Sequence, residues 1–600
     1  MTIKALKKLT FCGLSKAKPA ALAALQQLGK AHLITAGRQA GEIPHSPPKL
    51  AERAYKALKY LNQCPNRRHQ QHDPAHFDFN RMVDRTLEIQ FESRQLTDKR
   101  EALSKRINEV EPWGNFKLPE NHHLGGLKLW FYIVPKRLMR KVSASGLVWQ
   151  VVYQDNLNDY VVVIAEDEPP ITSMPVARTH TGTRSLAELK AELEEVELAL
   201  EDLQAERESL TRWIGLIAAN LGKALDRSEL NYAKGMTLDT DGVFISQVWA
   251  DTADLPAFEN YAAAHNLAMV SSDPEPSDVP PTLLKNTGFW SGGQDLTGFY
   301  QTPAYQGWDP SPVVFFSFAL FFAMIMCDAG YALLFGLLLA AKWRSMGKSV
   351  TGARIRMMIL AVLVASLVWG VLANSYFGYS FPEASVFAEL AIIKMEDFNA
   401  MMQLSVTIGV LHLALANAIT AYRRRLSLKA LASVGWLLII VGGYSFWLTQ
   451  PAPPALARDF SIAMLGLGGL LLLLFSCDRP VERPIDWLWR TAEGLKSLVE
   501  ITTLFGNILS YLRLFALGMA SVSLALTFNQ LALQVHHAMP GIGLVFSFLI
   551  LLIGHTLNLL LCLLGGVVHG LRLNFIEFYN WSVSDEGYPF KAFATRGVGQ

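Results

Sequence analysis

Two arginines lie deep inside long apolar stretches near the C-terminal end of the sequence. Arg513 lies in the segment SYLRLFALG, and Arg572 lies in VVHGLRLNFIEF. An arginine at the centre of a bilayer costs roughly 2.5–3.5 kcal/mol, so an intramembrane arginine normally faces a cavity or a carboxylate. Both guanidinium groups are therefore expected to meet a carboxylate inside the membrane.

Small and polar residues accompany each arginine along one face of its helix. Spacings of three and four residues place such a set on a single stripe. In the last apolar stretch the stripe consists of His555, Asn558, Cys562, Gly565, His569 and Arg572. In the preceding stretch it consists of Thr503, Gly506, Ser510 and Arg513, continuing through Ala520 and Thr527. Packing of helices through small residues would explain the glycines and serines but not the arginines and histidines.

Neither stripe carries a carboxylate that could neutralise its arginine. Glu500 precedes Arg513 on the same predicted helix but on a different face. The partner carboxylate is therefore expected on another subunit.

Seven apolar stretches in the C-terminal half have the length and composition of membrane spans. The last two are unusually long, so they are expected to tilt strongly or to protrude from the bilayer. The stretches cover residues 313–341, 355–376, 402–421, 430–448, 460–477, 495–534 and 541–580.

Basic residues gather in alternate loops, and such a bias normally marks the cytoplasmic side. The clusters are Lys342, Arg344, Lys348, Arg354 and Arg356, then Arg423, Arg424, Arg425 and Lys429, then Arg479, Arg483, Arg490 and Lys496. All three lie on the same side as the cytoplasmic N-terminal half only if the first stretch crosses twice, with its break at Cys327–Tyr331. The prediction is therefore eight spans with both termini cytoplasmic.

The N-terminal half has the composition of a soluble domain, and its first residues contain no apolar signal segment. A strand at Leu9–Cys12, a helix at about Pro19–Leu28 and a strand at Ala31–Ile34 indicate an α/β domain. Further strands are predicted at Leu127–Val134, Leu147–Tyr153, Tyr160–Ala165 and Gly242–Trp249.

Heptad spacing predicts that two helices, one before and one after the strands at 127–165, pair as an antiparallel coiled coil. Ile89, Leu96, Leu103 and Val110 lie seven residues apart, and a second heptad run from Leu186 is broken only at Arg207. Two surface helices packed on one core are the alternative. The predicted fold is a dumbbell of α/β lobes joined by this coiled coil, followed by an all-α membrane domain with eight spans. Its parts are a proximal lobe (1–82 and 225–306, including the membrane linker), coiled-coil arms (83–110 and 184–224), a distal lobe (111–183), a transmembrane domain (307–580) and a cytoplasmic tail (581–600).

Composition excludes several other classes. Hydrophobic residues make up 51% of the chain and charged residues only 18%, and the net charge of +2 argues against nucleic-acid binding. The five cysteines are scattered, which argues against a disulfide scaffold or an ordinary zinc site. No P-loop occurs, so we expect no ATP hydrolysis by this chain itself, and no cofactor or metal. A secondary transporter with a regulatory coiled-coil domain and a membrane-anchored coiled-coil tether remain as alternatives.

Several motifs resemble the membrane stator subunit of V-type and A-type rotary ATPases, called subunit a, or subunit I in prokaryotes. Gly506–Ser510 followed by YLRLFALG is similar to the seventh span of that subunit, and Gly554–Phe578 is similar to the eighth. The earlier spans and the membrane entry contribute further matches, namely Asp328–Tyr331, Trp369–Gly378, Leu404–Leu413, Pro280–Asn286 and Pro303–Pro310.

The resemblance implies an ion-translocating stator of a proton- or sodium-transporting ATPase in a prokaryotic cell membrane. Its arginines would face the carboxylates of a rotating ring of c/K proteolipid subunits. Its dumbbell would be held by peripheral stalk subunits of the E/G type, and a central-stalk protein of the C/d type would be a further partner in the membrane sector. Cys562 departs from the pattern, because eukaryotic relatives tend to carry a glutamate there. The resemblance assigns ion translocation to Arg513, Arg572, His569, Glu577, Ser510, Asn558, Glu500 and His555.

Overall fold

A computed structural model describes most of the chain. It covers residues 3–35, 49–73, 77–117, 126–170, 173–286, 288–382, 384–393, 397–425, 427–450, 455–476, 484–539, 541–583 and 585–595. Arg479 and Arg483 of the third basic cluster lie outside these residues. The chain divides into two compact units. The helical unit comprises residues 1–9, 249–257 and 270–591, and the arm unit comprises residues 10–248, 258–269 and 592–600.

The first sheet joins strands from both ends of the N-terminal half. The strand order is β2-β7-β1-β8, and β6 pairs with β7. The hydroxyl of Tyr261 in α7 donates to the carbonyl of Ala21 in α1 at 2.9 Å, which joins the two helices beside the sheet. The predicted β–α–β opening and the strand at 242–249 are confirmed, whereas β8 was missed. The bounds are β1 Leu6–Leu14, α1 Lys18–Leu28, β2 Ala31–Ile34, β6 Leu238–Thr240, β7 Val243–Asp251, α7 Leu255–Ala264 and β8 Ala268–Ser272.

A second, antiparallel sheet forms the lobe between the two long helices of the arm unit. Its order is β3-β5-β4, in agreement with the three strands predicted there. Trp113 packs edge-on against Phe131, with ring centroids 5.2 Å apart, and so ties the lobe to the end of the first long helix. The bounds are β3 Lys128–Pro135, α4 Met139–Ser143, β4 Val148–Gln154 and β5 Asn158–Ala165.

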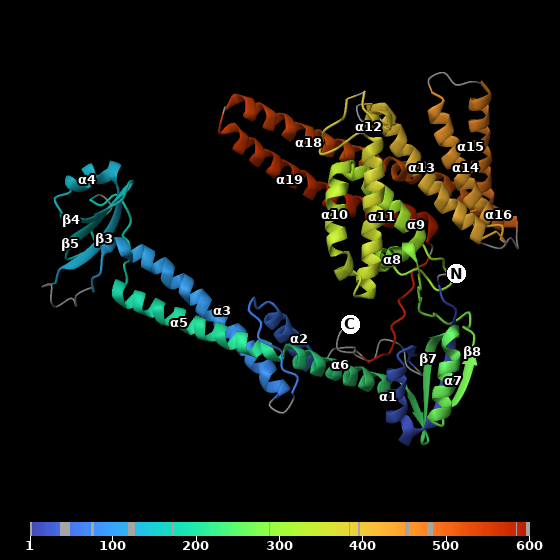
Figure 1. Cartoon of the computed structure of the whole chain (residues 1–600), viewed down its shortest axis with the longest axis horizontal. Helices are drawn as coiled ribbons and strands as arrows, with labels where there is room; N and C mark the ends of the chain where they lie inside the picture. Colours follow the sequence, from blue (N-terminus) through green and yellow to red (C-terminus); the bar gives the residue numbers. More distant parts are fainter. Residues whose placement is uncertain are drawn as a thin grey trace. The chain divides into compact units, whose positions relative to one another are not determined.

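Two long helices, α3 (Phe79–Val110) and α5 (Leu186–Leu210), lie side by side and antiparallel (Figure 1). An ion pair joins Lys99 to Glu192 at 2.8 Å, and another joins Arg85 to Glu206 at 2.7 Å. The Arg85 guanidinium lowers the pKa of Glu206 because it donates to the carboxylate. The seam between the helices is a cluster of Leu96, Leu103, Ile107, Val110, Leu186, Leu189, Leu193, Val196 and Leu200.

The break in the heptad run at Arg207 has a structural reason. Its guanidinium lies 3.9 Å from the ring centroid of Tyr60 and donates to the Tyr60 carbonyl at 2.7 Å. Tyr60 belongs to α2 (Lys49–Asn62), which packs on the base of the arm. A charged residue therefore replaces a seam residue where a third helix joins the pair. Beyond it the chain makes a 3₁₀ turn at Thr211–Trp213 and continues as α6 (Ile214–Met236).

The helical unit consists mainly of long apolar helices. In the described part of the chain, six helices are long and apolar enough to cross a membrane, and α9 is a shorter apolar helix. The count of eight spans therefore remains a prediction. The bounds are α8 Gly292–Tyr300, α9 Ser311–Met326, α10 Ala329–Met346, α11 Val350–Leu372, α12 Val386–Glu389, α13 Phe398–Arg423, α14 Ala430–Leu448, α15 Ala455–Phe475, α16 Pro484–Val499, α17 Ile501–Leu509, α18 Leu512–Ala538, α19 Gly543–Arg572 and α20 Tyr579–Ser582.

The first apolar stretch is broken at Cys327–Asp328, where the sequence predicted a turn. Asp328 is buried and caps α10, because its carboxylate accepts from the backbone N–H of Tyr331 at 3.0 Å. The same carboxylate accepts from the N–H groups of Phe377 and Gly378 and from the Ser375 hydroxyl, at 2.9–3.0 Å. Four donors thus compensate for burying the charge and fix the loop after α11 against the start of α10.

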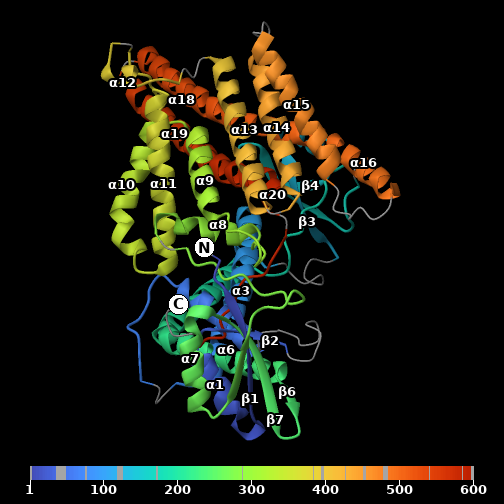
Figure 2. The same ribbon diagram turned by 90° about the vertical axis from the view of Figure 1, so that its right-hand side faces the viewer.

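The helices α18 and α19 lie side by side in both views (Figures 1 and 2). The predicted span 495–534 is not one regular helix, because the chain turns at Ser510–Tyr511 between α17 and α18. At its other end, α19 passes into a π-helix at Leu573–Phe578 before α20. Both irregularities lie next to the residues that the sequence singled out.

Candidate functional site

Arg513 lies in the first turn of α18, directly after the break in the helix. Its Nε donates to the carbonyl of Ser510 at 2.9 Å, and its backbone N–H donates to the same oxygen at 3.4 Å, so this residue is bound to the irregular turn by two hydrogen bonds. Its Nη2 donates to Oε1 of Glu577 at 2.7 Å. The Arg513 side chain is 23% exposed, whereas that of Glu577 is 2% exposed.

The pairing with Glu577 corrects the expectation that the partner of Arg513 lies only on another subunit. Neither polar stripe contains Glu577. Glu577 lies beyond the α19 stripe, inside the π-helix, where the wider turn alters which face a residue occupies. Its second oxygen, Oε2, is buried and has no hydrogen-bond partner among the described residues. Glu577 can therefore accept one more proton or donor.

A buried aromatic cluster supports the break before Arg513. The Tyr511 hydroxyl lies 2.8 Å from Nδ1 of His412 in α13. The imidazole of His412 stacks on Phe578, with ring centroids 4.4 Å apart. Gly409 allows this approach, because a Cβ there would lie 2.7 Å from the Tyr511 ring. The cluster thus holds Tyr511, two positions before Arg513, on one side and Phe578, the residue after Glu577, on the other.

A cleft of about 420 Å³ lies between α18 and α19. Its lining is mainly apolar, with a few polar groups at intervals. Asn558 donates to the Ser521 carbonyl at 3.1 Å, and the Cys562 thiol lies 2.9 Å from the Ser521 hydroxyl. Four residues of the predicted α19 stripe line this cleft, namely Asn558, Cys562, Gly565 and His569.

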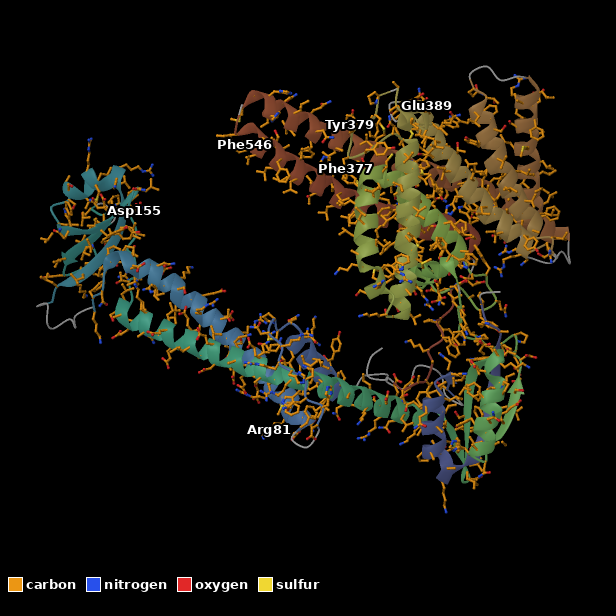
Figure 3. The ribbon with its side chains drawn as sticks, viewed as in Figure 1. Arg81, Asp155, Phe377, Tyr379, Glu389 and Phe546 are labelled. Atoms are coloured by element: carbon orange, nitrogen blue, oxygen red, sulfur yellow. The ribbon has the colours of Figure 1, made fainter. Side chains whose placement is uncertain are left out.

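The polar network continues toward the start of α19. Nδ1 of His555 lies 2.7 Å from the Tyr331 hydroxyl, and its Nε2 lies 3.0 Å from Oδ1 of Asn529. Asn529 also donates to the carbonyl of Phe377, which Figure 3 labels beside α18. Polar as well as small residues in the middle of the α19 stripe are thus packed against α18 and α10.

The structure brings only some of the expected residues together. Glu500 is exposed at the N-terminus of α17, and no contact joins its side chain to Arg513 among the described residues. Arg572 is exposed, and Thr503 and Thr527 of the other stripe are exposed as well. His569 lines the cleft, and its Nδ1 is buried without a hydrogen-bond partner among the described residues.

Four residues of the network were not singled out as site residues. They are Tyr331, His412, Ser521 and Asn529. The spacing Gly518, Ser521, Ala525, Asn529 and Ala532 contained a signal for two of them, since it describes a second small and polar face of α18. Tyr331 and His412 are polar groups inside apolar stretches, and both lie in motifs that resemble the stator subunit, Asp328–Tyr331 and Leu404–Leu413.

No family model matches the sequence. V-type ATP synthase subunit I of Chlamydia pneumoniae is 28% identical over 581 residues, covering 85% of both chains. The subunit I of Borreliella burgdorferi is 24% identical and covers 96% of both. A-type ATP synthase subunit I of Pyrococcus horikoshii is 29% identical over 335 residues, which cover 54% of this chain and 48% of that protein.

One solved structure that matches this chain is the cytoplasmic N-terminal domain of subunit I, a homologue of subunit a of V-ATPase. It is 15% identical, covers 44% of this chain and 100% of its own, and has a TM-score of 0.23, too low to support an argument. The sequence relatives nevertheless extend over most of this chain and share one name. This chain is therefore a homologue of subunit I of the V-type and A-type ATP synthases.

Proposed function

We propose that this chain is the ion-translocating stator subunit of a V/A-type rotary ATPase. The observation that carries the proposal is the ion pair of Arg513 and Glu577 within apolar helices, with the guanidinium still partly exposed. Among the described residues, Nε of Arg513 donates to the Ser510 carbonyl and Nη2 to Glu577. The partly exposed guanidinium therefore keeps donor capacity for a second carboxylate, which we assign to a subunit of the c/K ring.

Translocation would proceed by exchange of partners at Arg513. A ring carboxylate that arrives at α18 with its ion bound meets the guanidinium, which attracts the carboxylate in its ionised form and so favours release of that ion; the ionised carboxylate then competes with Glu577 for Arg513. Because arginine stays protonated at any working pH, the charge that prevents leakage between the two half-channels persists throughout the cycle. The unsatisfied Oε2 of Glu577 then offers a place for a proton or a hydrogen-bond donor during the exchange.

The remaining candidate residues would line the two half-channels. His569, Asn558 and His555 lie along the cleft and its polar extension, and Ser510 lies at the break before Arg513. Exposed Arg572 would meet the ring carboxylate one step away from Arg513. Glu500 lies outside this network, and we assign it to the mouth of a half-channel.

The rest of the molecule would serve as the stator and would have no catalytic role of its own. We propose that α3 and α5 form a coiled coil, that peripheral stalks of the E/G type hold the lobes, and that a central-stalk protein of the C/d type is a neighbour in the membrane sector. The helical unit would cross a prokaryotic cell membrane eight times, with the N-terminal lobes and the C-terminus in the cytoplasm. ATP hydrolysis or synthesis would take place on other subunits.

The test is ATP-driven ion uptake by membranes that contain the assembled complex. Arg513→Ala is expected to abolish uptake while the complex still assembles. Arg513→Lys is expected to retain little activity, because an ammonium lacks the forked geometry for two carboxylates. Arg572→Ala is the matched comparison and is expected to have a milder effect. Normal uptake by an assembled Arg513→Ala complex would reduce Arg513 to a packing role.

A further inference from the structure

A second, polar pocket of about 300 Å³ lies at the end of α13, the start of α14 and α20. Two consecutive arginines, Arg423 and Arg424, lie at its mouth. Its other lining residues are Asn417, Thr420, Ser433, Trp436, Asn580, Trp581, Ser582 and Val583. This pocket shares no lining residue with the cleft between α18 and α19.

The pocket carries positive charge without a balancing acid. Its lining contains two arginines and no aspartate or glutamate. Within the described part of the chain, no carboxylate lies within ion-pairing distance of Arg423 or Arg424, and Arg423 donates only to the Gln306 carbonyl at 2.8 Å. An anion with oxygen acceptors is the ligand that such a pocket would bind most strongly.

Tryptophan side chains form the inner wall of the pocket. The rings of Trp436 and Trp581 pack edge-to-face, with centroids 4.8 Å apart. Nε1 of Trp581 is buried and has no acceptor among the described residues. Tryptophan is enriched where a membrane meets water, because its ring is apolar and its N–H is polar.

An apolar pocket of about 410 Å³ lies farther along the same two helices. In α13, Val406 and Val410 of this pocket continue at helical spacing to Asn417 and Arg424 of the polar pocket. Asn417 lies seven positions after Val410, which is roughly 10 Å along the helix axis. In α14, Ser433 and Trp436 of the polar pocket continue at helical spacing to Ile440 and Tyr444 of the apolar pocket. The polar pocket and the apolar pocket thus lie on one seam, the contact between α13 and α14.

We propose that this seam binds an anionic membrane phospholipid, with its phosphate headgroup at Arg423 and Arg424 and an acyl chain along α13 and α14 toward the apolar pocket. The charge selects the headgroup, because each basic residue near a membrane surface adds attraction for anionic lipids. The apolar continuation selects a lipid over a free phosphate. The site serves to fix the α13–α14 pair beside α20, next to the helix end that carries Glu577.

The first experiment uses the full-length chain purified in detergent. Phosphatidylglycerol is expected to raise the unfolding temperature more than phosphatidylcholine does, and inorganic phosphate at the same concentration is expected to have little effect. A photoreactive phosphatidylglycerol is expected to label peptides that contain residues 417–424 and 433–447. Equal stabilisation by phosphatidylcholine, protection by phosphate as strong as that by the lipid, or labelling elsewhere would overturn the proposal.

The second experiment compares variants of neighbouring arginines. Arg423→Gln combined with Arg424→Gln is expected to weaken phosphatidylglycerol binding about tenfold, measured by native mass spectrometry. Arg425→Gln is the matched control, because Arg425 lies in the same run but stacks over Tyr422, 4.7 Å from its ring centroid. Equal losses in the two variants would show a general effect of loop charge and would exclude the site.

A third variant tests the apolar part without changing any charge. Gly443 lines the apolar pocket, and the nearest atom to a Cβ there lies 4.0 Å away, so a larger side chain can enter the pocket. Gly443→Leu is expected to weaken binding of long-chain phosphatidylglycerol several-fold and to leave short-chain phosphatidylglycerol unaffected. An equal effect on both chain lengths would contradict placement of the acyl chain there.

Discussion

Arg513 and Glu577 are 64 residues apart in the sequence, and their side chains meet with Nη2 2.7 Å from Oε1. The pair joins the start of α18 to the π-helix that follows α19. Each residue is placed by an interruption of regular α-helix, and Tyr511 and Phe578, one on either side of the pair, belong to the same aromatic cluster. The position of the guanidinium thus depends on packing far from it in the sequence.

Removal of the Glu577 carboxylate alone is predicted to lower the free energy of unfolding more than removal of both Glu577 and Arg513 charges does. Breaking a buried ion pair from one side costs about 3–5 kcal/mol. Because Arg513 is 23% exposed, we expect Glu577→Gln to cost roughly 1–3 kcal/mol. The double variant with Arg513→Gln is expected to recover part of this loss. Thermal unfolding of the purified chain in detergent measures the coupling.

Arg572→Gln is the control for this cycle, since Arg572 is an exposed arginine at the end of the neighbouring helix. It is expected to leave the unfolding temperature nearly unchanged. If the effects of Glu577→Gln and Arg513→Gln simply added, the two side chains would not be coupled in the folded protein.

The register of the arm is predicted to bring positions 99 and 192 together. Cysteines in place of Lys99 and Glu192 are expected to be joined by a short bis-maleimide, because these side chains form an ion pair at 2.8 Å. A cysteine at position 99 with one in place of Glu206 is the control, since Glu206 pairs with Arg85 instead. Both pairs are tested in a variant without the native cysteines. Crosslinking of the control pair alone would mean a different register.

Asp328 is predicted to stabilise the turn between α9 and α10 through its charge. In Asp328→Asn, an NH2 group would replace one carboxylate oxygen. This NH2 group would face two of the four donors that surround the side chain. We expect a loss of about 3 kcal/mol, since hydrogen bonds to charged groups contribute about 1.5–3 kcal/mol each. Ser375→Ala removes a single donor and is expected to cost about 1 kcal/mol. Resistance to thermal unfolding checks both variants, and equal losses would argue against a role for the charge.

The loop between α10 and α11 is predicted to face the cytoplasm. Ser349 caps α11 by accepting from the Gly352 N–H at 3.0 Å, so its replacement would disturb the helix. A cysteine at Lys348, in a variant without native cysteines, is therefore the better reporter. Only reagents that reach the cytoplasmic side are expected to label it. Labelling from the opposite side would mean that 311–346 crosses once.

Elements with a strong local pattern could be predicted from the sequence. The β–α–β opening, the three strands of the second sheet and the break at Cys327–Asp328 all follow from apolar runs and turn residues. The break at Ser510–Tyr511 could not be predicted, because neither residue opposes a helix. It depends on the packing of Tyr511 against Gly409 and His412, which are about a hundred positions away.

The candidate site was predicted in part, for a similar physical reason. Helical periodicity found the residues that line the cleft on α19, since they follow one regular helix. It missed the pairing with Glu577, because the π-helix changes the angular step between residues just where the carboxylate lies. The role of Glu500 in ion translocation comes from the resemblance and stays a prediction, and its exposed position at the N-terminus of α17 could not be inferred from spacing.

The π-helix at Leu573–Phe578 makes the direction of Glu577 depend on the number of residues in the segment as well as on their types. A regular α-helix turns about 100° per residue, and a π-helical turn contains roughly one residue more. Relaxation of this segment to regular α-helix without loss of a residue would rotate every later side chain by roughly 100° relative to α19. Such a change would retain Glu577 and Trp581 in the composition while turning both away from their neighbours. Relatives that are one residue shorter here would keep the same directions with a regular α-helix, so the π-helix accommodates the extra residue without moving the site.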